Sequence, residues 1–129
     1  MKLDILAFGA HPDDVELGAG GTLAKHAKQG AITGIIDLTR GEMGTRGTPE
    51  IRDEEAKNAA KILGCAVREN LNMRDGFLIN DEVSQLEIIK VIRKYQPEIV
   101  LINAPRDRHP DHGVASELVV QASFKAGFT

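Results

Sequence analysis

Four short apolar runs alternate along the chain with four longer stretches in which apolar residues recur at helical spacing. Runs of this length are typical of buried strands, and the periodic stretches are typical of amphipathic helices. We predict strands over residues 3–9, 31–39, 66–71 and 98–103. We predict helices over residues 15–29, 49–63, 81–95 and 113–125.

The alternating order βαβαβαβα predicts an α/β fold, with a Rossmann-like parallel sheet that carries helices on both faces. We expect one domain over residues 1–129. The common strand order 3-2-1-4 would make the first and the fourth predicted strands neighbours. Their carboxyl ends would then form the point of the sheet at which open α/β folds bind ligands.

Local signals sharpen two of the helices. Thr48 and Pro49 favour the start of the second predicted helix, and Gly64 favours its end. In the third predicted helix, five apolar residues recur at helical spacing, and we expect them to form its buried stripe. They are Val83, Leu86, Ile89, Ile92 and Tyr95.

Composition argues against several classes of protein. The net charge of −3 and the lack of a basic cluster argue against a nucleic-acid partner. Cys65 is the one cysteine, so no internal disulfide can form. No apolar run approaches the roughly 18 residues of a spanning helix. The first residues lack the pattern of a signal peptide. We therefore expect a cytoplasmic protein with no membrane partner.

Two polar clusters follow the first and the fourth predicted strands. Residues 11–14 contain one histidine and two aspartates, and residues 108–112 contain two histidines and one aspartate. If the two strands are neighbours, these side chains meet at one edge of the sheet. Imidazole and carboxylate groups from separate turns are the usual ligands of a catalytic zinc ion, which keeps a further position open for water.

Three residues of the clusters, His11, Asp14 and His112, could supply such a ligand set. Asp13 would then be free beside the metal centre. A carboxylate in that position can accept the proton of an attacking water and return it to a leaving group. The clusters therefore contain the parts of a hydrolytic site.

His109 would remain beside such a centre. Held by a nearby carboxylate such as Asp111, its imidazolium could stabilise a developing oxyanion. Structural roles are the alternative, because Asp13 or Asp14 could cap one following helix and Asp111 could cap another. Two such clusters at equivalent strand ends favour a functional site over two unrelated turns.

Residues 10–18 (AHPDDVELG) and residues 109–112 (HPDH) resemble the LmbE/PIG-L family of zinc-dependent N-deacetylases. Residues 39–48 (TRGEMGTRGT) and Arg52 are similar to the branch that deacetylates N-acetylglucosaminyl malate in bacillithiol biosynthesis. The resemblance covers nearly the whole chain in order. It implies a hydrolase that removes the N-acetyl group of an N-acetylglucosamine conjugate by means of a zinc-activated water, with Fe²⁺ or Co²⁺ as alternative metals.

The resemblance also implies roles for individual residues. The zinc ligands of the family match His11, Asp14 and His112. Its general base, which later serves as the acid, matches Asp13. The mechanism that follows has Asp13 taking a proton from the attacking water and passing it to the departing amine.

Further roles follow from the same resemblance. The residue that stabilises the oxyanion matches His109, and the carboxylate that orients it matches Asp111. Substrate contacts are expected from Arg52, Arg46 and Glu42. The small-molecule partner would be an amino sugar.

Family members are normally longer, so the chain resembles the amino-terminal portion of a longer fold. We also expect a homo-oligomer.

Two other functions stay open. A non-haem iron(II) oxygenase also binds its metal with two histidines and a carboxylate, and His11 and Asp13 have its His-x-Asp spacing. A receiver-like module would use Asp13 and Asp14 to hold magnesium. A fragment that binds metal without turnover is a third alternative.

Overall fold

The structure is a computed structural model that describes residues 1–128, and it has the predicted order of strands and helices. Within these residues no helix combines the length and the apolarity needed to cross a bilayer. The strands are β1 (Ile5–Gly9), β2 (Thr33–Thr39), β3 (Val67–Met73) and β4 (Ile99–Leu101). The helices are α1 (Asp14–Lys28), α2 (Pro49–Leu63), α3 (Glu82–Tyr95) and α4 (Pro110–Lys125).

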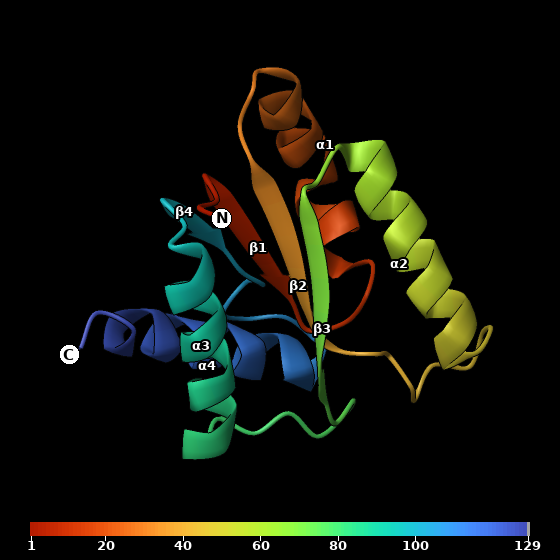
Figure 1. Ribbon diagram of the computed structural model, residues 1–129. Helices are drawn as coiled ribbons and strands as arrows, with labels where there is room; N and C mark the ends of the chain where they lie inside the picture. The colour runs from red at the N-terminus through yellow and green to blue at the C-terminus, as the bar shows by residue number, and fades with distance from the viewer. Residues whose placement is uncertain (129) are drawn as a thin grey trace.

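The four strands form one parallel sheet in the order β3-β2-β1-β4. Helices α1 and α2 cover one face of this sheet, and α3 and α4 cover the other (Figure 1). The predicted α/β fold and strand order are confirmed. The carboxyl ends of β1 and β4 are therefore neighbours, and both open toward the same edge of the molecule.

Every residue of β1 is buried, because the strand packs against helices on both faces. Leu6 and Phe8 point into the core beneath α3 and α4. Ile5 and Ala7 alternate with them and point into the smaller core beneath α1. Burial of each large apolar side chain contributes about 1.5–3 kcal/mol. This packing fixes the strand and therefore the position of the turn that follows it.

Helix α4 begins earlier than predicted, at Pro110 rather than Gly113. Proline suits the first helical position because its missing N–H needs no partner there. The side chain of His109 caps the helix by accepting a hydrogen bond from the backbone N–H of Asp111. Asp111 and His112 consequently lie in the first turn of a helix instead of on a loop, so the helix fixes their directions.

The buried stripe of α3 differs from the predicted one. Val83 and Leu86 are 71% and 47% exposed, whereas Ile88 is fully buried. Gln85 is buried beside it, and its amide group donates hydrogen bonds to Asn80 and Gln121. The face of α3 that packs against α4 thus includes the polar residue Gln85. The spacing of apolar residues alone could not identify this face.

The ends of α2 confirm the predicted signals. Thr48 Oγ1 accepts a hydrogen bond from the backbone N–H of Ile51 at 3.1 Å. Gly64 follows the helix with a φ of 74°, in the left-handed region that glycine adopts most easily. The start of α2 is therefore fixed next to the loop that joins it to β2.

Candidate functional site

The two polar clusters meet at the carboxyl ends of β1 and β4, as the predicted strand order requires. His11, Asp14 and His112 each offer one potential ligand atom, and these atoms lie within 4.8 Å of one another. Two nitrogens and one carboxylate oxygen at such separations fit a zinc-type ion. The alternative of a non-haem iron(II) oxygenase needs Asp13, in place of Asp14, as the carboxylate ligand. The magnesium alternative needs oxygen ligands without the imidazoles. Neither matches this group.

One carboxylate oxygen of Asp14 is the centre of the group. It lies 3.2 Å from His112 Nε2 and 3.4 Å from His11 Nδ1. The same oxygen accepts hydrogen bonds from the backbone N–H of His11 at 3.0 Å and from Asn103 Nδ2 at 3.3 Å. Asn103 also accepts a hydrogen bond from the backbone N–H of Ala10 at 2.9 Å. The ends of β1 and β4 are thus tied together at the candidate ligand.

The other ring nitrogens of the two histidines face carboxylates. His11 Nε2 lies 3.0 Å from Asp75 Oδ1 and 3.0 Å from Asp111 Oδ2. His112 Nδ1 lies 2.8 Å from Asp107 Oδ2. Metal-binding histidines usually donate their second ring N–H to a carboxylate, which fixes the ring and makes it a better ligand. The residues present therefore fit a metal ion bound through His11 Nδ1 and His112 Nε2.

The charges around His11 are predominantly negative. Burial by itself lowers the pKa of His11, but hydrogen bonds to Asp14 and Asp111, together with the charge of Asp75, raise it to about 9. Burial works against ionisation of Asp14, yet its bonds to His11 hold its pKa below the ordinary value. Three carboxylates thus surround one imidazole, and the cluster favours a positive charge at its centre.

Asp13 occupies a strained position beside this centre. Its φ of 96° lies in the left-handed region, which costs a residue other than glycine of order 1–3 kcal/mol. It precedes α1, yet its side chain makes no capping hydrogen bond. Burial raises the pKa of its carboxyl, and repulsion by Asp14 and Glu16 raises it further. Because the side chain makes no capping hydrogen bond, the alternative that Asp13 caps α1 is wrong. The side chain borders the cavity described below.

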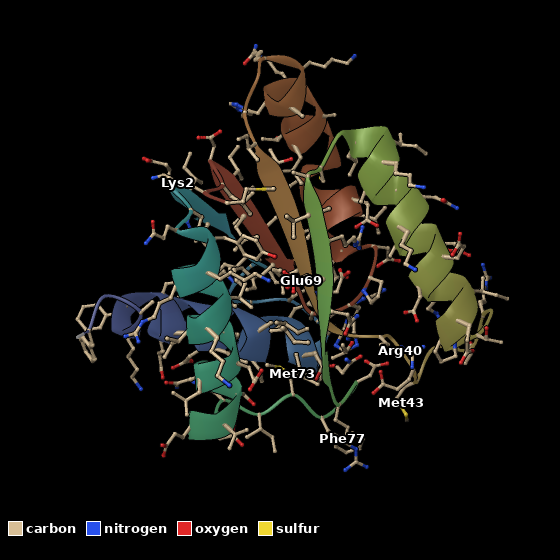
Figure 2. All side chains as sticks on the ribbon, in the orientation of Figure 1. Lys2, Arg40, Met43, Glu69, Met73 and Phe77 are labelled. Atoms are coloured by element: carbon tan, nitrogen blue, oxygen red, sulfur yellow. The ribbon has the colours of Figure 1, made fainter. Side chains whose placement is uncertain are left out.

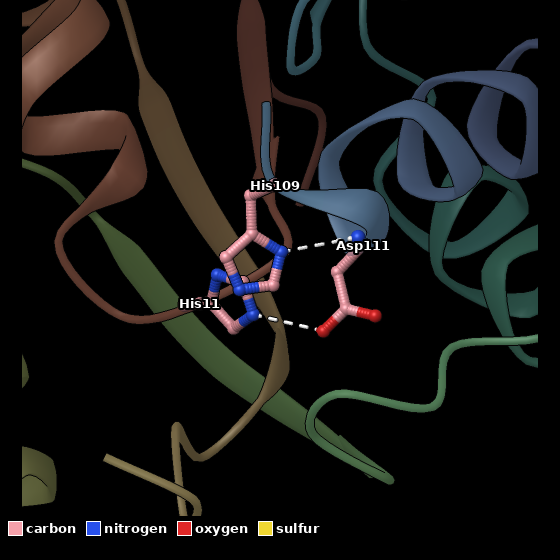
Figure 3. A group of neighbouring side chains, drawn as sticks. All are labelled: His11, His109 and Asp111. Carbon is pink, nitrogen blue, oxygen red and sulfur yellow. Dashed lines mark hydrogen bonds and ion pairs between the residues drawn. The ribbon is translucent and has the colours of Figure 1, made fainter. Parts of the chain in front are cut away.

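The relation between His109 and Asp111 differs from the expected one (Figure 3). His109 Nδ1 accepts a hydrogen bond from the backbone N–H of Asp111 at 3.1 Å, and the ring does not donate to the carboxylate of that residue in the part of the chain that the structure describes. The carboxylate of Asp111 accepts hydrogen bonds from the backbone N–H groups of Gly76 and Leu78, and it faces His11. Asp111 is buried at the start of α4 and its charge acts on His11, so we correct the expectation that its carboxylate orients His109.

A cavity of about 780 Å³ opens beside the cluster. Its wall includes His11, Asp13 and His109 on one side and the loop between β2 and α2, residues 40–48, on the other. Figure 2 places Arg40 and Met43 of this loop next to the start of α2. The cavity therefore lies between the candidate metal ligands and a glycine-rich loop.

Two of the three expected substrate-binding residues line this cavity, namely Arg46 and Arg52. Arg52 Nη2 donates a hydrogen bond to the backbone carbonyl of Arg46. Arg52 Nη1 is buried and has no hydrogen-bond partner among residues 1–128. A side chain at Gly44 would collide with this guanidinium, because its Cβ would stand 2.6 Å from Arg52 Nη2. Arg52 thus contributes to the cavity wall while one of its buried nitrogens lacks an acceptor among the described residues.

Glu42, the third expected substrate contact, is not among the described residues that line the cavity. Its carboxylate accepts hydrogen bonds from the backbone N–H groups of Arg40 at 3.2 Å and of Asp75 at 2.8 Å. These bonds hold the loop onto the segment that follows β3. We therefore assign Glu42 to support of the loop instead of contact with substrate.

Sequence reasoning missed three residues of the site. Asn103 ties Asp14 to the end of β1, and Asp75 and Asp107 face the outer ring nitrogens of the two histidines. Asp75 had the signal of a turn, Asp75-Gly76, and Asn103 ended a predicted strand. Asp107 directly precedes the recognised cluster of residues 108–112. Nothing in the local sequence distinguished Asp75 or Asn103 as residues of the site.

Comparison with known proteins gives the same family for nearly the whole chain. Residues 6–123 match the PIG-L family, described as GlcNAc-PI de-N-acetylase. The Uncharacterized deacetylase YaiS of Escherichia coli is 44% identical, over 84% of this chain and 61% of its own length. The crystal structure of the conserved protein TT1542 from Thermus thermophilus superposes with a TM-score of 0.94 at 48% identity, over 98% of this chain and 57% of that one.

Relatives with more specific names differ in what they act on. The Diacetylchitobiose deacetylase of Thermococcus kodakarensis is 37% identical, over 95% of this chain and 50% of its own length. The Probable N-acetyl-alpha-D-glucosaminyl L-malate deacetylase 2 of Bacillus subtilis is 29% identical, over 97% and 62%. The 4-oxalmesaconate hydratase of Pseudomonas putida is 32% identical, over 94% and 52%. The chain thus spans between half and two thirds of the length of these curated relatives.

Proposed function

The chain belongs to the PIG-L family, and we propose that the protein is a zinc-dependent N-deacetylase that hydrolyses the acetamido group of an N-acetylglucosamine conjugate. The observation that carries this proposal is the convergence of His11, Asp14 and His112 beside a cavity that Asp13 also lines. All four residues lie in the two motifs that resemble the deacetylases. The cytoplasmic location and the homo-oligomeric state remain predictions.

The residues that would hold the metal are His11 through Nδ1, His112 through Nε2 and Asp14 through its carboxylate. A zinc ion bound there supplies Lewis acidity and lowers the pKa of a bound water to about 7. Excess carboxylate charge around His11 supports a cation at this position. Carboxylates on the outer ring nitrogens support imidazoles that are held in one orientation.

Asp13 is the group that we assign to proton transfer. It borders the cavity, and burial together with repulsion by Asp14 raises the pKa of its carboxyl, which makes it a stronger base than an exposed aspartate. It accepts a proton from the attacking water as the new C–O bond forms at the acetyl carbonyl. It returns this proton to the amide nitrogen as the C–N bond breaks, which yields acetate and a free amine.

His109 is the group that we assign to stabilisation of the oxyanion. Its ring lies at the cavity with its centroid 4.5 Å from that of His11. Because Nδ1 accepts the N–H of Asp111, the proton of a neutral ring resides on Nε2. That N–H can donate to a carbonyl oxygen that gains negative charge in the transition state.

N-acetylglucosaminyl malate is the substrate that we propose. Arg46 and Arg52 line the cavity, and their guanidinium charges suit an anionic group such as the carboxylates that malate carries. The loop that contains Arg46, together with Arg52 of α2, resembles the malate branch of the family. Acetate release from this conjugate, from N-acetylglucosamine and from diacetylchitobiose should be fastest with the malate conjugate. Faster release from diacetylchitobiose contradicts this choice of substrate and leaves the reaction class intact.

The reaction is tested by two neighbouring aspartates with different assigned roles. Asp14→Ala is expected to lose about one equivalent of bound zinc and all acetate release, because it removes a ligand. Asp13→Asn is expected to keep its zinc while kcat falls roughly 10²–10⁴-fold, the usual contribution of a general base. Elemental analysis measures the metal, and an acetate assay measures turnover.

The contrary results are equally defined. Wild-type protein without a transition metal, or loss of zinc from Asp13→Asn instead of Asp14→Ala, contradicts the metal assignment. Full activity of Asp13→Asn contradicts its role as base. Wild-type protein that binds zinc but releases no acetate from any of the three compounds contradicts the deacetylase function.

A further inference from the structure

We propose that Asp75 is a positioning residue that couples the candidate metal ligand His11 to the loop of residues 40–48. Asp75 follows β3 and is 5% exposed. Its Oδ1 lies 3.0 Å from His11 Nε2, and its Oδ2 accepts a hydrogen bond from the backbone N–H of Met43 at 2.8 Å. One buried carboxylate thus contacts the His11 ring with one oxygen and the cavity loop with the other.

The connection between the two segments is reciprocal. The backbone N–H of Asp75 donates a hydrogen bond to Glu42 Oε2 at 2.8 Å. Glu42 directly precedes Met43, whose backbone N–H donates to the Asp75 carboxylate. Hydrogen bonds to an ionised carboxylate are stronger than neutral ones, and exclusion of water strengthens them further. These two bonds fix residues 42 and 43 relative to the segment that follows β3.

The loop itself contains little that would make it rigid. Gly41, Gly44 and Gly47 lie within nine residues, and glycine loses more conformational freedom on ordering than any other residue. Met43, Gly44 and Arg46 all line the cavity. The position of this cavity wall therefore depends on outside anchors, and Asp75 is the anchor that also touches His11.

The second carboxylate at His11 differs from Asp75 in this respect. Asp111 accepts its remaining hydrogen bonds from Gly76 and Leu78, which belong to the segment after β3 and not to the cavity loop. Asp107 contacts His112 and accepts a hydrogen bond from the backbone N–H of His109. Of the carboxylates on the outer ring nitrogens, Asp75 alone among the described residues binds the loop of residues 40–48.

This inference rests on the proposed role of His11 as a metal ligand, and it is tested with Asp75→Asn in the protein carrying zinc. The asparagine side chain has a single acceptor oxygen. It can therefore accept from the backbone N–H of Met43 or from the ring N–H of His11, but not from both. The zinc dissociation constant, measured by competition with a chromophoric chelator, is expected to rise 10–100-fold. Amide hydrogen exchange over residues 41–47 is expected to be slowed by zinc in the wild type and to stay fast in the variant.

Asp107→Asn is the matched control, because it removes a carboxylate from His112 without touching the loop. It is expected to weaken zinc binding while leaving loop exchange at saturating zinc as in the wild type. A wild-type value of either readout in Asp75→Asn overturns the coupling. Absence of zinc binding by the wild-type protein overturns the proposed metal centre, and the coupling with it.

A second variant keeps the test open if Asp75→Asn does not fold. Met43→Pro deletes the amide that donates to Asp75 and leaves Asp75 and Asp111 in place at His11 Nε2. Zinc is expected to bind to this variant but no longer to slow exchange of the remaining loop amides. Protection by zinc equal to that of the wild type overturns the coupling. Circular dichroism confirms folding of each variant.

Discussion

Two buried clusters of charge in this molecule differ in how their charges are matched. In the first, Arg68 of β3 lies between Asp37 of β2 and Glu16 of α1. Its guanidinium donates to Asp37 through Nε at 2.8 Å and Nη2 at 2.9 Å, and to Glu16 through Nη1 at 2.9 Å. In the second, His11 is surrounded by Asp14, Asp75 and Asp111.

The difference separates a structural ion cluster from the candidate metal site. Burial disfavours the charge of Arg68, but its bonds to Asp37 and Glu16 keep its pKa above the usual value. This cluster supplies its own permanent cation. The cluster at His11 has three carboxylates around one titratable ring, so its positive charge must come from a proton or from a bound cation. The clusters therefore differ in the source of their positive charge, which is a permanent guanidinium in the first and a proton or an added cation in the second.

Removal of Arg68 is expected to have the largest effect on stability. Arg68→Met leaves Asp37 buried without its partner, since the two side chains are 6% and 2% exposed. Loss of one partner of a buried pair costs about 3–5 kcal/mol. Urea denaturation followed by circular dichroism measures the free energy of unfolding. The double variant Arg68→Met with Asp37→Leu is the control and should recover most of the loss. Equal stability of Arg68→Met and the wild type contradicts the structural role of this cluster.

Addition of zinc is expected to have the next largest effect, and only through the cluster at His11. A ligand at a hundredfold excess over its dissociation constant stabilises the folded state by roughly 3 kcal/mol. Urea denaturation with zinc and with a chelator should differ by about this amount in the wild type. Asp14→Ala should give no difference between the two conditions. Zinc stabilisation that survives in Asp14→Ala would place the metal elsewhere.

The smallest expected effect on stability concerns Glu42, whose carboxylate accepts hydrogen bonds from backbone amides. Partial burial raises the pKa of Glu42, but hydrogen bonds from the amides of Asp75 and Arg40 lower it more, so the net shift is downward. A depressed pKa contributes stability above the unfolded value of about 4.5, and this is lost as pH falls through the folded value. The urea midpoint of Glu42→Gln should lie slightly below that of the wild type at pH 7, and the gap should narrow as the pH is lowered from 7 toward 3. A gap that widens toward pH 3 contradicts this assignment.

The sequence by itself determined the order of elements, the fold class and the two motifs of the site. Apolar runs and helical periodicity are local, so they identify β1 and β2 and the ends of α2 without knowledge of what they contact. The motifs after β1 and β4 could be joined because parallel α/β folds bring the carboxyl ends of neighbouring strands together. His11, Asp14 and His112 could therefore be grouped before their geometry was known.

Tertiary structure alone decided which partners each side chain has. Asp75 lies in the segment after β3, and Asn103 and Asp107 lie in the segment between β4 and α4. Their spacing from His11 in sequence carries no information about the contacts that they make. The same holds for Glu42 and Asp111, whose carboxylates bind backbone amides of a distant segment instead of a substrate or His109. Hydrogen bonds between loops depend on how the sheet and helices place those loops, and this information is absent from any local pattern of residues.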